Sequence, residues 1–217
     1  MLIGCLHTAP TNVPGLDVAA AGVEGLELRH VVRPDLLAAA LAAGQMTDGV
    51  RVEAELELRK LASACDAVLL TCSSIGRAIE GVQDEAVPVI RVDAALAEHA
   101  VAGGGRVVVL YAAPSTASPT GQLFAAAAAT SGATIDMRMV TRAWDLFSAG
   151  DQAGYFALIA KAADAAYHDG ADIVALAQVS MAGAAELVKA GPIPLTSPAI
   201  GLRAVIERLV GPGGEPA

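Results

Sequence analysis

The sequence predicts an α/β protein of two similar lobes, each with a mostly parallel four-stranded sheet, the lobes being related by a pseudo-twofold. Short apolar runs bounded by polar residues alternate with amphipathic stretches, as in parallel sheets covered by helices. The chain also repeats itself. Residues 66–76 (DAVLLTCSSIG) align without gaps with residues 172–182 (DIVALAQVSMA). A repeat of this size indicates a duplicated unit.

Two further pairs of segments support the duplication. Residues 2–10 (LIGCLHTAP) match residues 106–114 (RVVVLYAAP), and the strand after Pro88 matches the strand after Pro194. Three pairs in the same order, at nearly the same spacing, are hard to produce by chance.

The repeat sets the expected lobe boundaries. We expect the first lobe over residues 1–97, with residues 198–217 packing back on it, and the second lobe over residues 98–197. Three consecutive glycines at residues 103–105 form a flexible link between the halves. They are no phosphate-binding loop, because no Lys-Ser/Thr pair and no G-x-G-x-x-G follows them.

The first half is expected to hold four strands. The strand at residues 1–7 delivers His7 and Thr8 to a loop rich in Pro, Thr and Asn. The apolar run at residues 67–70 predicts a buried strand, and helical spacing of apolar residues from Ile75 onward predicts a helix after it. The other elements expected here are strands at 26–32 and 87–92 and helices at 35–43, 50–64 and 93–101.

The second half repeats this pattern. A turn over residues 113–120 and an alanine-rich helix over residues 121–131 follow its first strand. The remaining expectations are strands at 106–111, 134–140 and 194–196, helices at 151–168 and 198–209, and a frayed tail at 211–217.

Composition narrows the function classes. The net charge is −9 and the 14 basic residues are scattered, which argues against a nucleic-acid surface. The most apolar run, residues 123–129, is far shorter than the roughly 18 to 20 residues that cross a bilayer. Cys5, Cys65 and Cys72 show no CxxC spacing, so neither a structural zinc nor a disulfide framework is indicated. Free thiols suit a reducing compartment, and we expect a cytoplasmic protein without membrane or nucleic-acid partners.

Cys72 is the leading catalytic candidate. It lies where the carboxyl end of a strand meets the amino end of the predicted helix. Unpaired backbone N–H groups and the positive end of the helix dipole collect there, so an anion can dock and a thiol can ionise more easily. Cys72 is therefore placed to act as a nucleophile or a base.

These residues carry a resemblance. The TCSS turn at residues 71–74, the APST turn at 113–116, the LAQVSMA segment at 176–182 and the duplication together resemble the aspartate/glutamate racemase superfamily, which includes hydantoin racemases, maleate isomerases and arylmalonate decarboxylases. The likeness covers nearly the whole chain. It implies two facing α/β lobes, no cofactor, and a small carboxylic acid as substrate.

The resemblance also implies roles for individual residues. Cys72 matches the catalytic cysteine of the first turn, and the residues expected to bind substrate are Thr8, Ser73, Ser74, Ser115, Thr116 and Ser180. Ser115 and Thr116 match the turn that holds the substrate carboxylate. No metal ligand is implied.

The sequence departs from the family at Gln178, which stands where a second cysteine is usual. Inverting a stereocentre by deprotonation needs a base on each face of the carbon, and glutamine cannot serve as one. It can hold a carboxylate or an enediolate oxygen by hydrogen bonds. A single thiol suits one-sided protonation, as in a decarboxylase, or covalent addition, as in a cis–trans isomerase. His7 is a candidate second base.

Simpler roles compete with these. Cys72 is alternatively a compact core residue, His7 a hydrogen-bonded residue at a strand end, and the Ser and Thr side chains helix caps. Two classes of function are therefore carried forward: a cofactor-independent isomerase, racemase or decarboxylase, and a two-lobe protein that binds a small carboxylic acid and retains a vestigial cysteine. The substrate, the reaction and any homo-oligomer stay open.

Overall fold

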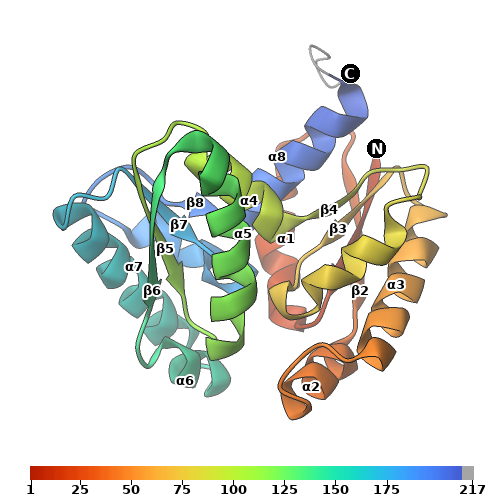
Figure 1. Cartoon of the computed structure of the whole chain (residues 1–217), viewed down its shortest axis with the longest axis horizontal. Coiled ribbons are helices and arrows are strands. Elements are labelled where there is room, and N and C mark those ends of the chain that lie inside the picture. Colours follow the sequence, from red (N-terminus) through yellow and green to blue (C-terminus); the bar gives the residue numbers. More distant parts are fainter. Residues whose placement is uncertain (212–217) are drawn as a thin grey trace. The chain divides into compact units, whose positions relative to one another are not determined.

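The computed structural model describes residues 1–211 and divides the chain into two compact units (Figure 1). One unit comprises Met1–Ala95 and the chain from Pro198 onward, and the other comprises Leu96–Ser197. From residue 212 on, the expected tail lies outside the described residues. Among the described helices, none is long and apolar enough to cross a membrane.

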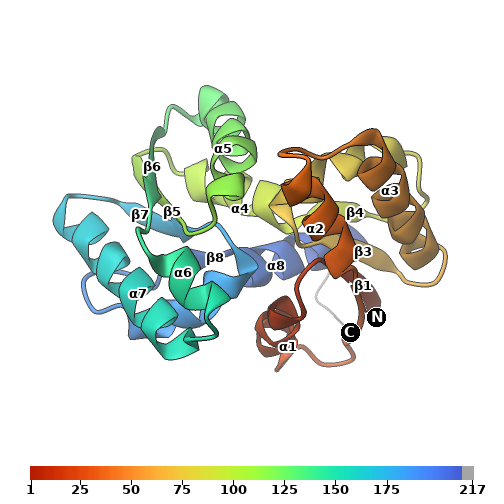
Figure 2. The same cartoon turned by 90° about the horizontal axis from the view of Figure 1, so that it is seen from below.

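The first unit is built on a sheet with the strand order β2-β1-β3-β4, in which every neighbouring pair is parallel. Helices α2 and α3 pack against each other beside this sheet (Figure 2). Its strands are β1 (Leu2–His7), β2 (Glu27–Val32), β3 (Ala67–Leu70) and β4 (Val89–Arg91). Its helical segments are η1 (Pro10–Asn12), α1 (Val13–Ala20), α2 (Pro34–Ala42), α3 (Asp48–Ala62), η2 (Ser73–Val82), the start of α4 (Val92–Val101) and α8 (Ser197–Val210), where η denotes a 3-10 helix.

The second unit repeats this plan, with the parallel order β6-β5-β7-β8. Its strands are β5 (Arg106–Tyr111), β6 (Thr134–Met139), β7 (Ile173–Leu176) and β8 (Leu195–Thr196). Its helical segments are η3 (Pro114–Thr116), α5 (Ala117–Ser131), α6 (Ala143–Ser148), α7 (Gln152–His168) and η4 (Val179–Leu187). The predicted α/β class with two parallel four-stranded sheets is confirmed.

The two sheets also share their register. Leu6 pairs with Leu70 in the first sheet, and Leu110 pairs with Leu176 in the second. Each of these strand pairs therefore ends two residues before the aligned positions, Cys72 in one unit and Gln178 in the other.

The same hydrogen bond closes the first strand of both sheets. The N–H of Leu2 donates to the Asp66 carboxylate at 2.7 Å, and the N–H of Arg106 donates to the Asp172 carboxylate at 2.7 Å. The aspartate that opens each aligned segment thus has the same structural task in both units.

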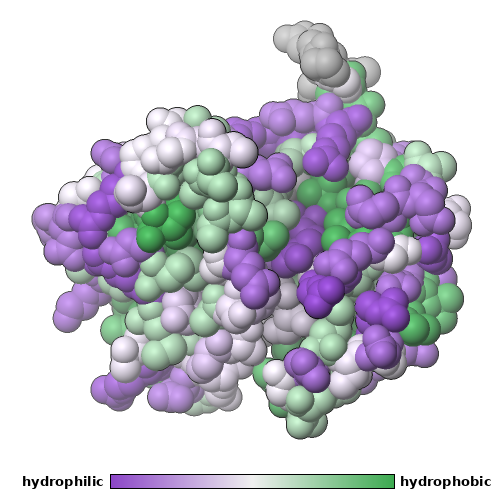
Figure 3. Space-filling view, in the orientation of Figure 1, coloured by the Kyte–Doolittle hydropathy of each residue, from purple (hydrophilic) through white to green (hydrophobic). Residues whose placement is uncertain are grey.

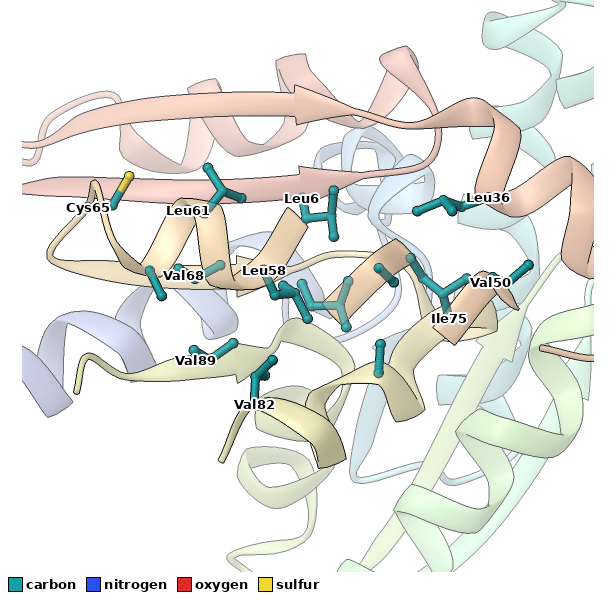
Figure 4. Packing of buried hydrophobic residues seen from close by; sticks show 14 of the residues in the cluster. Leu6, Leu36, Val50, Leu58, Leu61, Cys65, Val68, Ile75, Val82 and Val89 are labelled. Atoms are coloured by element: carbon teal, nitrogen blue, oxygen red, sulfur yellow. The ribbon is translucent and has the colours of Figure 1, made fainter. Parts of the chain in front are cut away.

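Alternation along β1 separates two environments. Leu6 faces a cluster formed with α2, α3, β3 and η2, where Leu36, Leu58 and Ile75 are buried (Figure 4). Because side chains alternate across a strand, Cys5 and His7 point to the opposite face. The first unit contains none of the three Phe, three Tyr and one Trp, all of which fall between Tyr111 and Tyr167. Its core is therefore aliphatic, whereas the second unit packs Phe147 against Tyr155 with ring centroids 5.3 Å apart.

Hydrophilic residues spread over both units on the face drawn in Figure 3, and hydrophobic ones are interspersed among them. Large exposed apolar side chains include Val18 and Ile193. Scattered residues of this kind are ordinary on a protein surface.

Several predicted elements differ from the structure. The segment after Cys72 is the 3-10 helix η2, because two serines and two glycines within it disfavour a continuous α-helix. Helix α5 begins at Ala117, earlier than expected, since Pro119 falls in the first turn, where no backbone N–H is needed. Helices α1 and α6 were not expected. The sequence predicts a loop rich in Pro, Thr and Asn after residue 8. Pro14 in this segment instead occupies the first turn of α1, where proline is favoured.

Candidate functional site

Cys72 lies at the turn between β3 and η2, as the sequence predicts. The Thr8 hydroxyl and the backbone N–H groups of Ile75 and Ser74 each act to lower the pKa of its thiol. Cys72 is also the only partly exposed cysteine, since Cys5 and Cys65 are buried and all three are in the described part of the chain. Two backbone donors from this turn and the hydroxyl of the residue after β1 therefore favour the thiolate of Cys72.

Desolvation nevertheless dominates the ionisation of this thiol. Although Cys72 is partly exposed, surrounding protein raises its pKa above the ordinary value, and the negative charge of Asp93 adds to the effect. The hydrogen bonds from Thr8, Ile75 and Ser74 oppose this rise without overcoming it. The expectation of an easily ionised thiol is therefore wrong for the protein as it stands. At neutral pH Cys72 carries its proton.

The Arg91–Asp93 ion pair lies close to this turn. Arg91 donates Nε to one Asp93 oxygen at 2.9 Å and Nη2 to the other at 2.7 Å, and both side chains are nearly buried. A Cβ added to Gly76 would lie 2.3 Å from the Arg91 guanidinium carbon. Glycine at position 76 therefore makes room for the guanidinium against η2.

Ser73 and Ser74 follow Cys72 in η2 and are half-buried. The residue at the cap position of η2 is Cys72, and no side chain caps this segment. In the second unit Ser115 is exposed and Thr116 is buried; Thr116 precedes α5 without making a side-chain cap bond. Helix capping therefore does not explain the hydroxyl side chains at these positions. Their role in binding substrate stays a prediction.

Gln178 occupies the corresponding turn of the second unit, between β7 and η4. Its Oε1 accepts the backbone N–H groups of Ala112 at 2.7 Å and Ala113 at 2.8 Å. Backbone N–H groups only donate, so the orientation of the Gln178 amide is fixed by chemistry. Its Nε2 has no partner within residues 1–211. The group that Gln178 offers is therefore a hydrogen-bond donor.

Ser180 is engaged inside the second unit. Its Oγ lies 2.9 Å from the Tyr155 hydroxyl, and Tyr155 is buried. Burial raises the pKa of Tyr155 to about 12, while the bond to Ser180 lowers it slightly. Ser180 would have to share its hydroxyl between Tyr155 and any ligand.

His7 is fully buried at the end of β1. Its Nδ1 lies 2.9 Å from the Thr71 hydroxyl, and its Nε2 lies 2.8 Å from His30 Nδ1. Burial, together with neighbouring His30, lowers the pKa of His7 to about 4, although the charge of Asp17 acts in the opposite direction. As a base toward substrate, His7 would have to give up one of these bonds, and that role stays a prediction.

The repeat also identifies a residue that the sequence interpretation missed. Asn12 N donates to Ala9 O at 3.1 Å, and Thr116 N donates to Ala113 O at 3.0 Å, so the two residues end equivalent turns. Both side chains are buried. Extending the alignment of residues 2–10 by two positions would have paired Asn12 with Thr116.

Each of the two α/β units has a parallel four-stranded sheet, and this is the fold of the aspartate/glutamate racemases. Among solved structures, the chain is similar to the aspartate racemase of Picrophilus torridus, with 13% identity, a TM-score of 0.73, and coverage of 96% of this chain and 94% of that one. It is similar to the allantoin racemase of Pseudomonas fluorescens, with 17% identity, a TM-score of 0.66 and coverage of 100% and 99%.

A third similar structure is the glutamate racemase of Francisella tularensis in complex with D-glutamate, with 16% identity, a TM-score of 0.62, and coverage of 99% of this chain and 84% of that one. No family model matches the sequence, and no curated protein does. The resemblance predicted from the TCSS and APST turns is thus confirmed at the level of the fold.

Proposed function

We propose that this protein acts on the carbon next to the carboxylate of a small acid, as a cofactor-independent member of the aspartate/glutamate racemase superfamily that uses the single thiol of Cys72. The aspartate and glutamate racemases among the similar solved structures support this substrate class. In the proposed reaction Cys72 exchanges a proton with one face of that carbon.

The observation that carries the proposal is the hydrogen bonding of Gln178. At the turn equivalent to that of Cys72, its Oε1 is held by the N–H groups of Ala112 and Ala113. The amide nitrogen is left to donate, and a neutral amide cannot remove or supply a proton at carbon. One thiol and one donor favour protonation of one face over inversion.

The proposed proton transfer is balanced as follows. Either a bond from the reacting carbon to hydrogen breaks and the thiolate form of Cys72 takes the proton, or a bond to a carboxyl group breaks and that group leaves as carbon dioxide. In both cases the electron pair enters the carboxylate that stays on the carbon and gives an enediolate. The Cys72 thiol then delivers its proton to the carbon, and the thiolate recovers a proton from water. Donors such as the Gln178 amide would stabilise the enediolate oxygen. A thiol that is protonated in the resting protein suits the acid role.

The test is a substrate panel in deuterated water followed by proton NMR and chiral chromatography. The panel contains both enantiomers of aspartate and glutamate, hydantoins, maleate and arylmalonates. We expect the protein either to incorporate deuterium at the carbon next to the carboxylate or to release carbon dioxide from the substrate. In both cases the product should be a single enantiomer. Rapid racemisation of aspartate or glutamate that is unchanged in Gln178→Ala and in His7→Ala would contradict the single-thiol mechanism.

A second candidate is a binding protein for a small carboxylic acid. The raised pKa of Cys72 favours it, because a thiol that does not ionise is a poor nucleophile. Calorimetry with the same panel separates the two functions. Binding of an acid with no deuterium exchange, no carbon dioxide release and no isomerisation would favour this candidate over the enzyme.

A further inference from the structure

Three metal-ligating side chains that are scattered in the sequence meet on one face of the first sheet. Cys5 and His7 are two residues apart on β1, and His30 on β2 is the register partner of Cys5. The sulfur of Cys5 and one ring nitrogen of each histidine all lie within 4.8 Å of one another. Among the described residues, this is the one group of three or more His, Cys, Asp or Glu side chains close enough to share a metal ion.

The two imidazoles meet edge to edge. Nε2 of His7 and Nδ1 of His30 are 2.8 Å apart, while the ring centroids are 5.1 Å apart and the planes differ by 28°. The distance between the ring centroids exceeds the distance between the two nitrogens by about two ring radii, so both nitrogens lie close to the line that joins the centroids. The two nitrogens therefore point at each other.

The outer nitrogens of both rings are held by oxygen atoms. The Thr71 hydroxyl lies 3.0 Å from the carbonyl of Leu6, to which it can donate, and it then accepts from His7 Nδ1 at 2.9 Å. His30 Nε2 lies 3.0 Å from the Asp17 carboxylate, which accepts. In this tautomer the inner nitrogens present two lone pairs to each other, and a cation between them, a proton or a metal ion, satisfies both.

A metal ion fits this arrangement. Histidine ligands of metals usually donate their other N–H to a carboxylate or another oxygen, and here Asp17 and Thr71 provide both contacts. Zinc–nitrogen bonds of about 2.0–2.1 Å in a tetrahedral site require the two nitrogens to separate by about half an ångström. His30 is partly exposed and Asp17 is exposed, so an ion can enter from that side, whereas Cys5 and His7 are buried.

We propose that Cys5, His7 and His30 form a binding site for one divalent transition-metal ion of the zinc class, with Asp17 and Thr71 orienting the histidines. The ion joins strands β1 and β2, and the Asp17–His30 contact adds α1. Binding replaces the thiol proton of Cys5 by a metal–sulfur bond and releases that proton to water, while both histidines enter neutral. Three protein ligands leave the fourth tetrahedral position to water.

The experiment is a titration of the chelator-treated full chain with Co²⁺, followed by absorption spectroscopy. We expect one equivalent to give the d–d bands of tetrahedral cobalt and a sulfur-to-cobalt charge-transfer band. Zn²⁺ then displaces it, because zinc binds such ligands more tightly. Calorimetry in buffers of different ionisation enthalpy measures about one proton released per ion.

Variants assign the site. Asp17→Asn, on an exposed side chain, is expected to weaken the affinity about 10- to 100-fold, as outer-sphere changes do. His30→Gln and Cys5→Ala are expected to cost more, and Cys5→Ala also removes the charge-transfer band. Cys65→Ala, a buried cysteine of the same unit outside the group, is the matched control and is expected to bind as the unmodified protein does. Circular dichroism checks that each variant is folded.

Two results would overturn the proposal. If the folded, unmodified chain shows no cobalt bands, the two histidines share only a proton or a simple hydrogen bond. If ion binding is as tight in Cys5→Ala and in Asp17→Asn as in the unmodified chain, the ion binds elsewhere. Neither result depends on the outcome of the substrate panel.

Discussion

The Cys72 turn and the Gln178 turn share one backbone design and differ in chemistry. Sheet order, register and the closing aspartate bond are the same in both units. In the first unit two N–H groups of the turn, together with the Thr8 hydroxyl after β1, favour the ionised form of a thiol. In the second, two N–H groups hold the carbonyl oxygen of Gln178. A duplicated scaffold can therefore place two chemically different side chains, a thiol and an amide, at the same position of its two units.

Removing the thiol tests this comparison most strongly. Cys72→Ala is expected to lower any turnover found in the substrate panel by about 100- to 10,000-fold, the range for losing one acid–base group. The measurement is deuterium incorporation by NMR. Cys65→Ala, in the same unit, is the control and should retain the rate. Comparable turnover in Cys72→Ala would remove this cysteine from the mechanism.

Making the turns alike should add an activity. Gln178→Cys puts a thiol at the position aligned with Cys72 and removes the Oε1 that now accepts the N–H groups of Ala112 and Ala113. Racemisation of a substrate from the panel is expected to rise by about 100-fold, because a second acid–base group is restored. Chiral chromatography measures it. Gln178→Ala removes the amide without adding an acid, and an equal rise in that variant would show that the new thiol is not the cause.

Alkaline pH should affect the second unit through Tyr155. Its pKa is raised to about 12 in the folded protein, against an ordinary value of 10.0. The folded state therefore keeps a proton that the unfolded state loses, so the stabilisation is complete below pH 10 and is lost as the pH rises toward 12. The loss is about 2 to 3 kcal/mol. Urea unfolding followed by the fluorescence of Trp144 measures it.

The control for this effect is Tyr155→Phe. This variant loses the hydrogen bond to Ser180 but has no phenol to ionise, so its stability should fall less between pH 10 and 12. Identical pH dependence in the two proteins would mean that Tyr155 is not held protonated by burial.

The smallest expected effect compares Gly76 with Ala182, which are aligned in the repeat. In Gly76→Ala the new methyl group would meet the Arg91 guanidinium, which its bonds to Asp93 hold in place. We expect a loss of about 1–3 kcal/mol in the free energy of unfolding, typical of overpacking. Ala182→Gly should cost about 0.5–1 kcal/mol, the usual price of glycine. Urea unfolding followed by circular dichroism measures the free energy of unfolding of both variants. Equal losses in the two variants would mean that the space beside Arg91 does not require glycine at position 76.

Much of the fold follows from local patterns. Apolar runs and the repeat predict both sheets, and the alignment of residues 66–76 with 172–182 identifies the turns that carry Cys72 and Gln178. Local sequence patterns do not predict properties that depend on contacts between residues far apart in the sequence. The rise in the pKa of Cys72 depends on surrounding burial, which outweighs the donors that a strand-to-helix turn supplies.

The histidine network shows the same limit. Asp17, His30 and Thr71 have no motif spacing, because they come from α1, from β2 and from the residue after β3. Parallel pairing of β1 with β2 places His30 beside Cys5, and only the register reveals this. Likewise, the sequence shows that Gln178 aligns with Cys72, but not that its carbonyl oxygen accepts the N–H groups of Ala112 and Ala113.

The division of the chain has a consequence for its synthesis. The compact unit that begins at Met1 also contains the chain from Pro198 onward, and Gly201 in α8 is close enough to Val92 that a Cβ there would lie 2.7 Å from its side chain. During translation the ribosome completes residues 96–197 before it supplies α8. The second unit can therefore finish folding first, while the unit that is begun first must wait for its last helix.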